Sequence, residues 1–330
     1  MRRPSIPGLV LADGWLAPYQ GEIQARMRLY DAQLQRICKR WGSLLDCANG
    51  FTRMGFTRVA STGEWVYREW APGARELYLI GDFNNWDRTA TPMQRNREGV
   101  WKVKLPADAL HHGSRVKVHV VGADMEHRDR MPAWIRYTQQ DEKTFDYCGV
   151  IWEPEQPYKW KHTRWTPTRV KTPFIYECHI GMGQDEEKVG TYLEFKDNVL
   201  PRIVKDGYNC MQLMAVQEHP YYGSFGYHVS NFFAASSRFG TPEELKELID
   251  AAHQQGVAVI MDLVHSHAVK NENEGLGNIA GDPNQYFCSG DRREHNQWDS
   301  LCFDYGKNQV IHFLLSNCKY WLEEFHFDGF

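Results

Sequence analysis

The most constraining feature of the sequence is a helix signal that lies between two short apolar runs. Thr241, Pro242 and Glu244 occupy the positions of an N-cap, a first helical residue and the partner in a capping box. The apolar face consists of Leu245, Leu248, Ile249 and Ala252, and Gly256 follows the end of the helix. Residues 208–214 and 257–264 on either side lack polar alternation, which is typical of parallel strands buried on both faces. The unit therefore predicts a parallel β-sheet.

The same pattern extends to both sides of this unit. Residues 173–180 form an earlier apolar run, a helix is expected over 308–325, and residues 327–330 begin another strand. The helix would turn its apolar residues inward, namely Val310, Leu314, Cys318, Trp321 and Phe325. A doubly wound sheet usually has a glycine-rich turn after its first strand, and residues 179–183 match that turn weakly. We therefore expect residues 173–330 to be the first half of a (β/α)8 TIM barrel, truncated at strand 4.

Upstream of this region the hydrophobic period is two. Short β-rich runs at 65–70, 76–83, 101–106 and 115–122 are separated by turn residues, which predicts an all-β sandwich over 55–153. A proline-rich linker is expected over 154–172.

The N-terminal segment, residues 1–54, contains one amphipathic helix signal. Between residues 19 and 41 the apolar positions form a single stripe: Ile23, Met27, Tyr30, Leu34, Ile37 and Trp41. A helix docked on the neighbouring domain and a coiled-coil partner site both fit this stripe.

Composition excludes several classes of function. The chain of 330 residues is 42% hydrophobic and 24% charged with a net charge of -4, so neither nucleic acid nor a membrane is expected as a partner. The first 14 residues lack the apolar stretch of a signal peptide. Eight scattered cysteines without a Cys-x-x-Cys pair indicate reduced thiols and a cytoplasmic location.

Candidate functional residues follow two of the predicted strands. Asp262, His265 and His267 come where the third barrel strand ends, and functional groups gather at that end of a barrel. A buried structural role, a zinc site and sugar chemistry all fit these residue types. After the second strand, residues 221–228 contain aromatic side chains among glycines, which could stack on a glucosyl ring or pack in the core.

At these residues the sequence resembles a known family. The runs EHPYYGSFGYHVSNFFAASSRFGTPEELK, MDLVHSHAVKN and WLEEFHFDGF are similar to the eukaryote-like 1,4-α-glucan branching enzymes of glycoside hydrolase family 13. The runs EWAPG and GDFNNWDR resemble the starch-binding sandwich of the same family, a carbohydrate-binding module 48. The run SNFFAASSRFGTPEELK favours branching over a related debranching hydrolase. A non-catalytic glucan-binding module with a partial barrel is the alternative from another class.

The resemblance implies a set of substrate-binding residues. Asp262 and His267 would bind the glucose at the reacting subsite, and Tyr227 would stack under it. Further glucan contacts are implied for four positions: Trp70, Trp86, His295 and Trp298. The partner would be an α-1,4-glucan (glycogen, amylose or amylopectin), with no cofactor and no metal.

The resemblance also places the catalytic carboxyl groups outside the sequence. The family's Phe-Asp-Gly-Phe motif is followed by Arg-Phe-Asp, so the nucleophile would lie beyond Phe330, as would the acid/base. Asp328 begins a strand instead of ending one, and we do not expect it to substitute. A retaining mechanism needs both carboxyl groups, so the chain as given is expected to be an inactive fragment.

Overall fold

The structure is a computed structural model that describes residues 7–330. The chain forms two compact units that divide between Asn49 and Gly50. The first unit contains three helices, α1 (Gly8–Ala12), α2 (Gln20–Trp41) and α3 (Leu44–Cys47). Helix α2 confirms the helix predicted over 19–41, although Ile37 is the one buried side chain of the predicted stripe and Tyr30 is 57% exposed.

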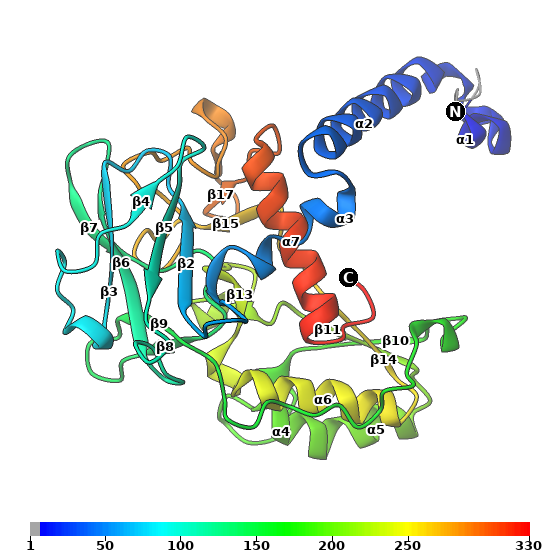
Figure 1. Cartoon of the computed structure of the whole chain (residues 1–330). Helices are drawn as coiled ribbons and strands as arrows, with labels where there is room; N and C mark the ends of the chain where they lie inside the picture. The colour runs from blue at the N-terminus through cyan, green and yellow to red at the C-terminus, as the bar shows by residue number, and fades with distance from the viewer. Residues whose placement is uncertain (1–6) are drawn as a thin grey trace. The chain divides into compact units, whose positions relative to one another are not determined.

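The second unit begins with the predicted β-sandwich (Figure 1). One sheet has the order β1-β2-β5-β4, and the other has the order β3-β6-β9-β8 with β7 paired to β6. The strands are β1 (Gly55–Arg58), β2 (Trp65–Trp70), β3 (Glu76–Gly81), β4 (Gln94–Arg95), β5 (Val100–Leu105), β6 (Arg115–Val121), β7 (His127–Arg130), β8 (Thr138–Gln140) and β9 (Tyr147–Val150). Strand β2 has the bounds that the sequence predicts, because its alternation and its flanking turns are local signals.

Three parallel strands follow, β10 (Ile175–Cys178), β11 (Cys210–Leu213) and β14 (Ala258–Met261), in the order β10-β11-β14. Next to β14, Gly329 forms a parallel bridge with Ile260, at the place predicted for a fourth strand. The helices of this region are α4 (Tyr192–Glu194), α5 (Leu200–Lys205), α6 (Pro242–Gln254) and α7 (Asn308–Glu324). In Figure 1, α4, α5 and α6 lie together along one side of the strands. Sequential parallel strands with helices between them are the barrel type of arrangement.

Helix α6 forms as its sequence predicts. The Thr241 side chain accepts a hydrogen bond from the backbone N–H of Glu244, and the Glu244 carboxylate accepts one from the backbone N–H of Thr241. The two bonds satisfy donors that a helix start otherwise leaves unpaired. The face that carries Leu245, Leu248, Ile249 and Ala252 is fully buried.

One prediction for the parallel strands is wrong. Strand β10 was expected to be buried on both faces, but Ile175, Tyr176 and Glu177 are exposed and Cys178 alone is buried. The reason is that β10 is an edge strand, paired on one side with β11, and within residues 7–330 no strand pairs with its other side. An apolar sequence shows that a strand can be buried. Whether it is buried depends on which strands and helices pack against it.

Smaller antiparallel strands surround the ends of β11 and β14. The first pair is β12 (Gln217–Glu218) with β13 (Asn231–Ala235), and a second sheet joins β15 (His267–Val269), β17 (Ser300–Cys302) and β16 (Glu294–His295). They organise the long segments that follow the parallel strands.

The proline-rich linker is irregular, yet it is fixed to the barrel region. The Asp250 carboxylate on α6 accepts hydrogen bonds from the Tyr158 hydroxyl and from the backbone N–H groups of Lys161 and His162. The first two bonds measure 2.7 Å and the third 2.9 Å. The linker therefore behaves as a packed strap along α6 more than as a flexible connection.

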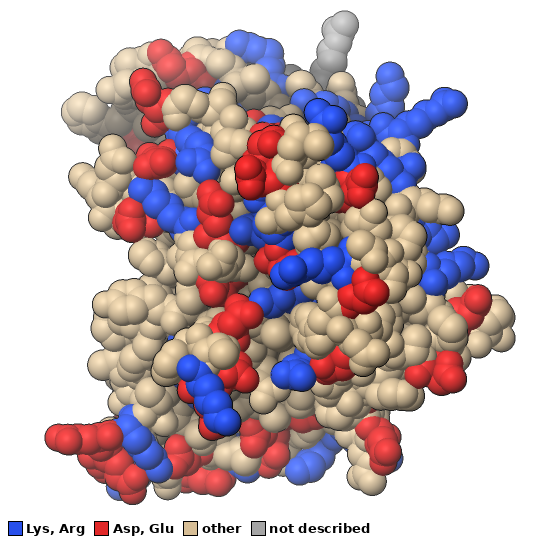
Figure 2. All heavy atoms as spheres, turned by 90° about the vertical axis from the view of Figure 1, so that its left-hand side faces the viewer, with Lys and Arg blue, Asp and Glu red and all other residues tan. Residues whose placement is uncertain are grey.

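The surface of the sandwich carries charges of both signs. Figure 2 looks onto this face and shows Lys and Arg interspersed with Asp and Glu. Ion pairs of the sandwich include Arg88 with Asp129 at 2.6 Å and Arg115 with Asp82 at 3.0 Å. Among residues 7–330 no helix is both long enough and apolar enough to cross a membrane.

Candidate functional site

The candidate site lies where β11 and β14 end. Asp262 directly follows β14, and its backbone N–H donates to the Leu213 carbonyl at 2.9 Å. Its carboxylate accepts hydrogen bonds from the Tyr227 hydroxyl at 2.7 Å and from the Gln212 amide at 2.8 Å. Because each carboxylate oxygen has one of these donors, the side chain is held in a single orientation.

Tyr227 is a hydrogen-bond donor in this arrangement. Burial, the hydrogen bond to Asp262 and the charge of that carboxylate together raise the pKa of Tyr227 well above its usual value. The phenol therefore keeps its proton at neutral pH. Its ring is partly buried and packs against the hydrophobic core.

His267 lies beside this pair and has a defined tautomer. Its Nε2 is 3.0 Å from the Tyr227 carbonyl oxygen, which can only accept, so Nε2 carries the hydrogen. Its Nδ1 is 2.9 Å from the Ser266 hydroxyl, which donates to it when the ring is neutral. Burial is the largest cause that lowers the pKa of His267. The ring is therefore neutral at pH 7, with the proton on Nε2.

The predicted loop residues His295 and Trp298 join the same site. Their rings stack with centroids 4.1 Å apart and an interplanar angle of 8°. The Trp298 ring lies 5.5 Å from the His267 ring, and His228 Nε2 donates to the Trp298 carbonyl at 2.8 Å. Trp298 is 54% exposed, so one aromatic side chain of the site is open to a ligand.

The two predicted tryptophans of the sandwich lie apart from the cluster of Tyr227, Asp262 and His267. The half-buried ring of Trp70 stands perpendicular to Tyr286 at 5.2 Å, and its carbonyl accepts from Gln285 at 2.6 Å, so it packs at the junction with the barrel region. The half-buried Trp86 lies on the turn after β3, where its indole N–H donates to Asp82 at 3.1 Å. The Arg115 guanidinium lies 6.0 Å from the Trp86 ring.

Two other polar residues considered in the sequence turn away from the site. His265 donates to the Asn317 side chain on α7 at 2.8 Å, and burial lowers its pKa. Asp328 accepts from the Trp165 indole at 2.6 Å, the Val259 backbone at 2.7 Å and His253 at 2.9 Å. These bonds give His265 and Asp328 structural roles. In the described part of the chain no three His, Cys, Asp or Glu side chains are grouped to hold a metal ion.

Three polar residues were not predicted from the sequence: Gln212 and His228, which contact the site, and Glu218, which lies outside it. Gln212 is a polar residue in a buried parallel strand, and that position could have identified it. His228 is placed by a contact with a residue 70 positions away, which a local pattern does not reveal. Glu218 is fully buried and accepts from Thr138 in the sandwich at 2.6 Å.

Comparison with known families finds matches to two regions of the second unit. Residues 53–135 match the model of carbohydrate-binding module 48 (isoamylase N-terminal domain), and residues 209–302 match the alpha amylase catalytic domain. A 1,4-alpha-glucan-branching enzyme of Aspergillus oryzae is 46% identical over 99% of the chain and 48% of its own length. The chain is therefore similar over nearly its whole length to 1,4-alpha-glucan-branching enzymes. It spans about half the length of the curated branching enzymes it matches.

Other similar proteins agree with this result. A chloroplastic/amyloplastic 1,4-alpha-glucan-branching enzyme of Arabidopsis thaliana is 47% identical over 96% of the chain and 40% of its own length. Among solved structures, the catalytic module of the glycogen-degrading pneumococcal virulence factor SpuA has a TM-score of 0.69. It is 17% identical and covers 86% of this chain and 47% of its own. At that identity the match supports the fold alone, a sandwich followed by part of an amylase-type domain.

Proposed function

We propose that the protein containing this chain is a 1,4-α-glucan branching enzyme. It would cut an α-1,4-glucan and transfer the released segment to a 6-hydroxyl, forming an α-1,6 branch. The observation that carries the proposal is the hydrogen bond between Tyr227 and Asp262, with His267 beside it, in a chain similar to branching enzymes over nearly its whole length.

The proposed roles follow from the contacts of each side chain. Each Asp262 oxygen accepts one bond within the protein and keeps a second acceptor position for a sugar hydroxyl. The Nδ1 of His267 would exchange the Ser266 hydroxyl for a sugar hydroxyl, while its Nε2 stays on the Tyr227 carbonyl. Hydrogen bonds that strengthen as the oxocarbenium-like transition state forms raise the rate more than the affinity.

Iodine staining of amylose tests this activity, using protein expressed from the complete reading frame. Branching shortens the unbranched segments and lowers the iodine absorbance without releasing reducing ends. Asp262→Asn and His267→Ala are expected to lower turnover by about 10²-fold or more, by analogy with loss of a positioned transition-state donor. His111→Ala, at an exposed histidine of the sandwich, is the matched control.

The same assay separates the alternatives. A debranching hydrolase would release reducing ends from amylopectin, which contains the α-1,6 bonds that amylose lacks. A non-catalytic glucan-binding module would change neither signal on either glucan. Wild-type turnover in both site variants would contradict the assignment of the reacting subsite.

We also propose that the sandwich binds α-glucan through Trp86, whose half-buried indole lies on an exposed turn and is held by Asp82. An indole face suits the apolar face of a glucosyl ring. Affinity electrophoresis in amylose gels should show less retardation for Trp86→Ala than for wild type. Trp15→Ala, at a side chain that is 89% exposed in the N-terminal unit, is the control. Equal retardation in a folded Trp86→Ala protein would contradict the site.

A cytoplasmic location is part of the same proposal. All eight cysteines are free in the structure, and free thiols persist in reducing compartments. Cell fractionation with an antibody against the chain would test the location.

A further inference from the structure

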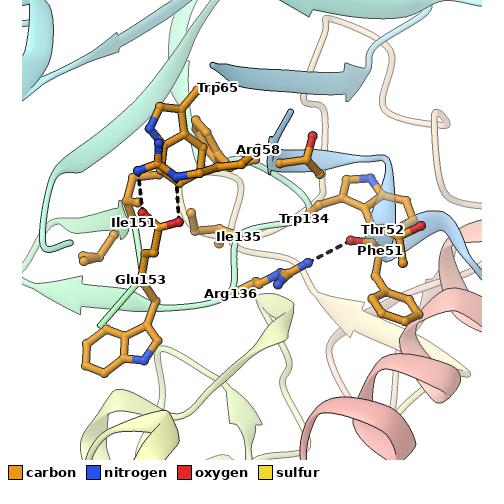
Figure 3. A pocket seen from close by; sticks show the side chains of 13 residues that line it. Phe51, Thr52, Arg58, Trp65, Trp134, Ile135, Arg136, Ile151 and Glu153 are labelled. Carbon is orange, nitrogen blue, oxygen red and sulfur yellow. Dashed lines mark hydrogen bonds and ion pairs between the residues drawn. The ribbon is translucent and has the colours of Figure 1, made fainter. Parts of the chain in front are cut away.

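The sandwich has a cavity that shares no residue with the candidate site and none with the Trp86 turn. Its volume is about 510 Å³, and it lies between strands β1 and β2 and two later segments, residues 134–136 and 150–153 (Figure 3). That size is within the range of pockets that hold small ligands.

One end of the cavity carries a fixed pair of planar charged groups. The Arg58 guanidinium donates to both carboxylate oxygens of Glu153, at 2.7 and 2.6 Å, as Figure 3 shows. The same guanidinium lies 4.1 Å from the centre of the Trp65 ring. Glu153 is partly exposed, and its oxygens keep acceptor positions that Arg58 does not fill. The pair therefore offers rigid acceptors to the hydroxyl groups of a ligand.

The other end carries Arg136, a half-buried cation with few partners. It donates to the Phe51 carbonyl at 2.9 Å, and its guanidinium lies 5.6 Å from the Tyr320 ring. Within residues 7–330 it forms no ion pair within 4.0 Å. A guanidinium has five N–H donors, so Arg136 has donors left for a ligand.

Aromatic side chains also line the cavity. Phe51, Trp65 and Trp134 are largely buried, whereas Phe56 and Trp152 are partly exposed. Stacking on Tyr67 at 4.3 Å fixes the ring of Phe56. The lining thus combines aromatic rings with the charged groups of Arg58, Glu153 and Arg136.

We infer that this cavity is a second binding site for α-1,4-glucan, separate from the reacting site and from Trp86. Sugars present apolar C–H faces and a rim of hydroxyl groups, which match aromatic walls and planar polar ends. Glu153 neutralises Arg58, so the one unbalanced positive charge of the lining is that of Arg136. A neutral sugar brings no charge that must be buried when it binds. The choice of ligand rests on the proposed function.

Titration calorimetry with maltoheptaose tests the inference in protein expressed from the complete reading frame with Trp86→Ala, which removes the other proposed sandwich site. This background should keep measurable binding. Adding Arg136→Gln or Glu153→Gln should weaken it by about tenfold to a hundredfold, the range that losing a hydrogen bond to a charged group produces. Arg75→Gln, an exposed arginine elsewhere on the sandwich, should have no effect. Thr57→Phe narrows the cavity without removing either charged end and should also weaken binding, with the melting temperature reporting that each variant is folded.

Two results would overturn the inference. One is unchanged maltoheptaose affinity in all three cavity variants, in a protein that still branches amylose, which leaves the proposed function intact. The other is binding of inorganic phosphate that Arg136→Gln abolishes while maltoheptaose affinity stays constant, which would make the cavity an anion site. Absence of both branching and maltoheptaose binding in the wild type would instead contradict the proposed function.

Discussion

Glu69 in β2 is expected to make the stability of the fold depend on pH. Its side chain is almost completely buried and accepts hydrogen bonds from the Tyr67 hydroxyl at 2.7 Å and from the backbone N–H groups of Ala133 and Trp70. Burial raises the pKa of Glu69 to about 7, against these three bonds, which lower it. The perturbation we propose is Glu69→Gln, which keeps the shape of the side chain and removes its titration.

The sign and size of the effect follow from the two pKa values. Between pH 4.5, the ordinary value of the carboxyl, and about 7, the folded state holds a proton that the unfolded chain has lost. The free energy of unfolding therefore falls as pH rises through this window. One pKa unit corresponds to about 1.36 kcal/mol, so the whole window is worth roughly 3 kcal/mol. Above pH 7 the contribution is constant, because both states are ionised.

Urea denaturation of the wild type and of Glu69→Gln at pH 4.5 to 8 measures this contribution. Burial lowers the pKa of His265 and of His267, which also makes stability depend on pH, but both residues are common to the two proteins and their effects cancel in the difference. The stability of the wild type relative to the variant should fall by roughly 3 kcal/mol between pH 4.5 and 8. Parallel stability curves would refute the reasoning, since they would mean that the three donors keep the folded carboxylate ionised.

Three further perturbations test other parts of the structure. Tyr227→Phe keeps the ring but removes a hydrogen bond to the Asp262 carboxylate, so amylose branching should slow by about tenfold or more while glucan retention stays constant. Thr138→Val removes the hydroxyl that donates a hydrogen bond to buried Glu218. Urea denaturation should show a free energy of unfolding lower by about 1–3 kcal/mol. No change would show that the carboxylate finds another donor. The 330-residue chain should self-associate through β10, because this edge strand has one unpaired side and its Ile175 is 42% exposed. Ile175→Lys should shift the sedimentation coefficient towards that of the monomer. A monomeric wild type would contradict this prediction.

Local signals predicted the fold elements well, and contacts between distant residues explain the rest. The capping box of α6 and the bounds of β2 depend on residues within a few positions of one another. The exposure of β10 depends on which strands pair with it, and an apolar run carries no information about that. In the same way the family resemblance predicts roles for Tyr227 and Asp262, whereas the amide of Gln212 that holds Asp262 became evident only when β11 and β14 were placed side by side.

The buried carboxylate of Glu218 explains how the sandwich and the barrel region form a single compact unit. Its oxygens accept from the Thr138 hydroxyl on β8 at 2.6 Å, from the Ser237 backbone at 2.9 Å and hydroxyl at 2.7 Å, and from the His219 backbone at 3.1 Å. A buried carboxylate is tolerated only when such donors replace the hydrogen bonds of the lost water. Moving the sandwich away from β12, which carries Glu218, would remove the Thr138 donor and leave the carboxylate with an unfilled acceptor position. The two regions are therefore expected to move as one body. The distance between a glucan-binding site on the sandwich and Asp262 would then be fixed by this junction. The fold would therefore set how many glucosyl units of a bound glucan lie between the two sites.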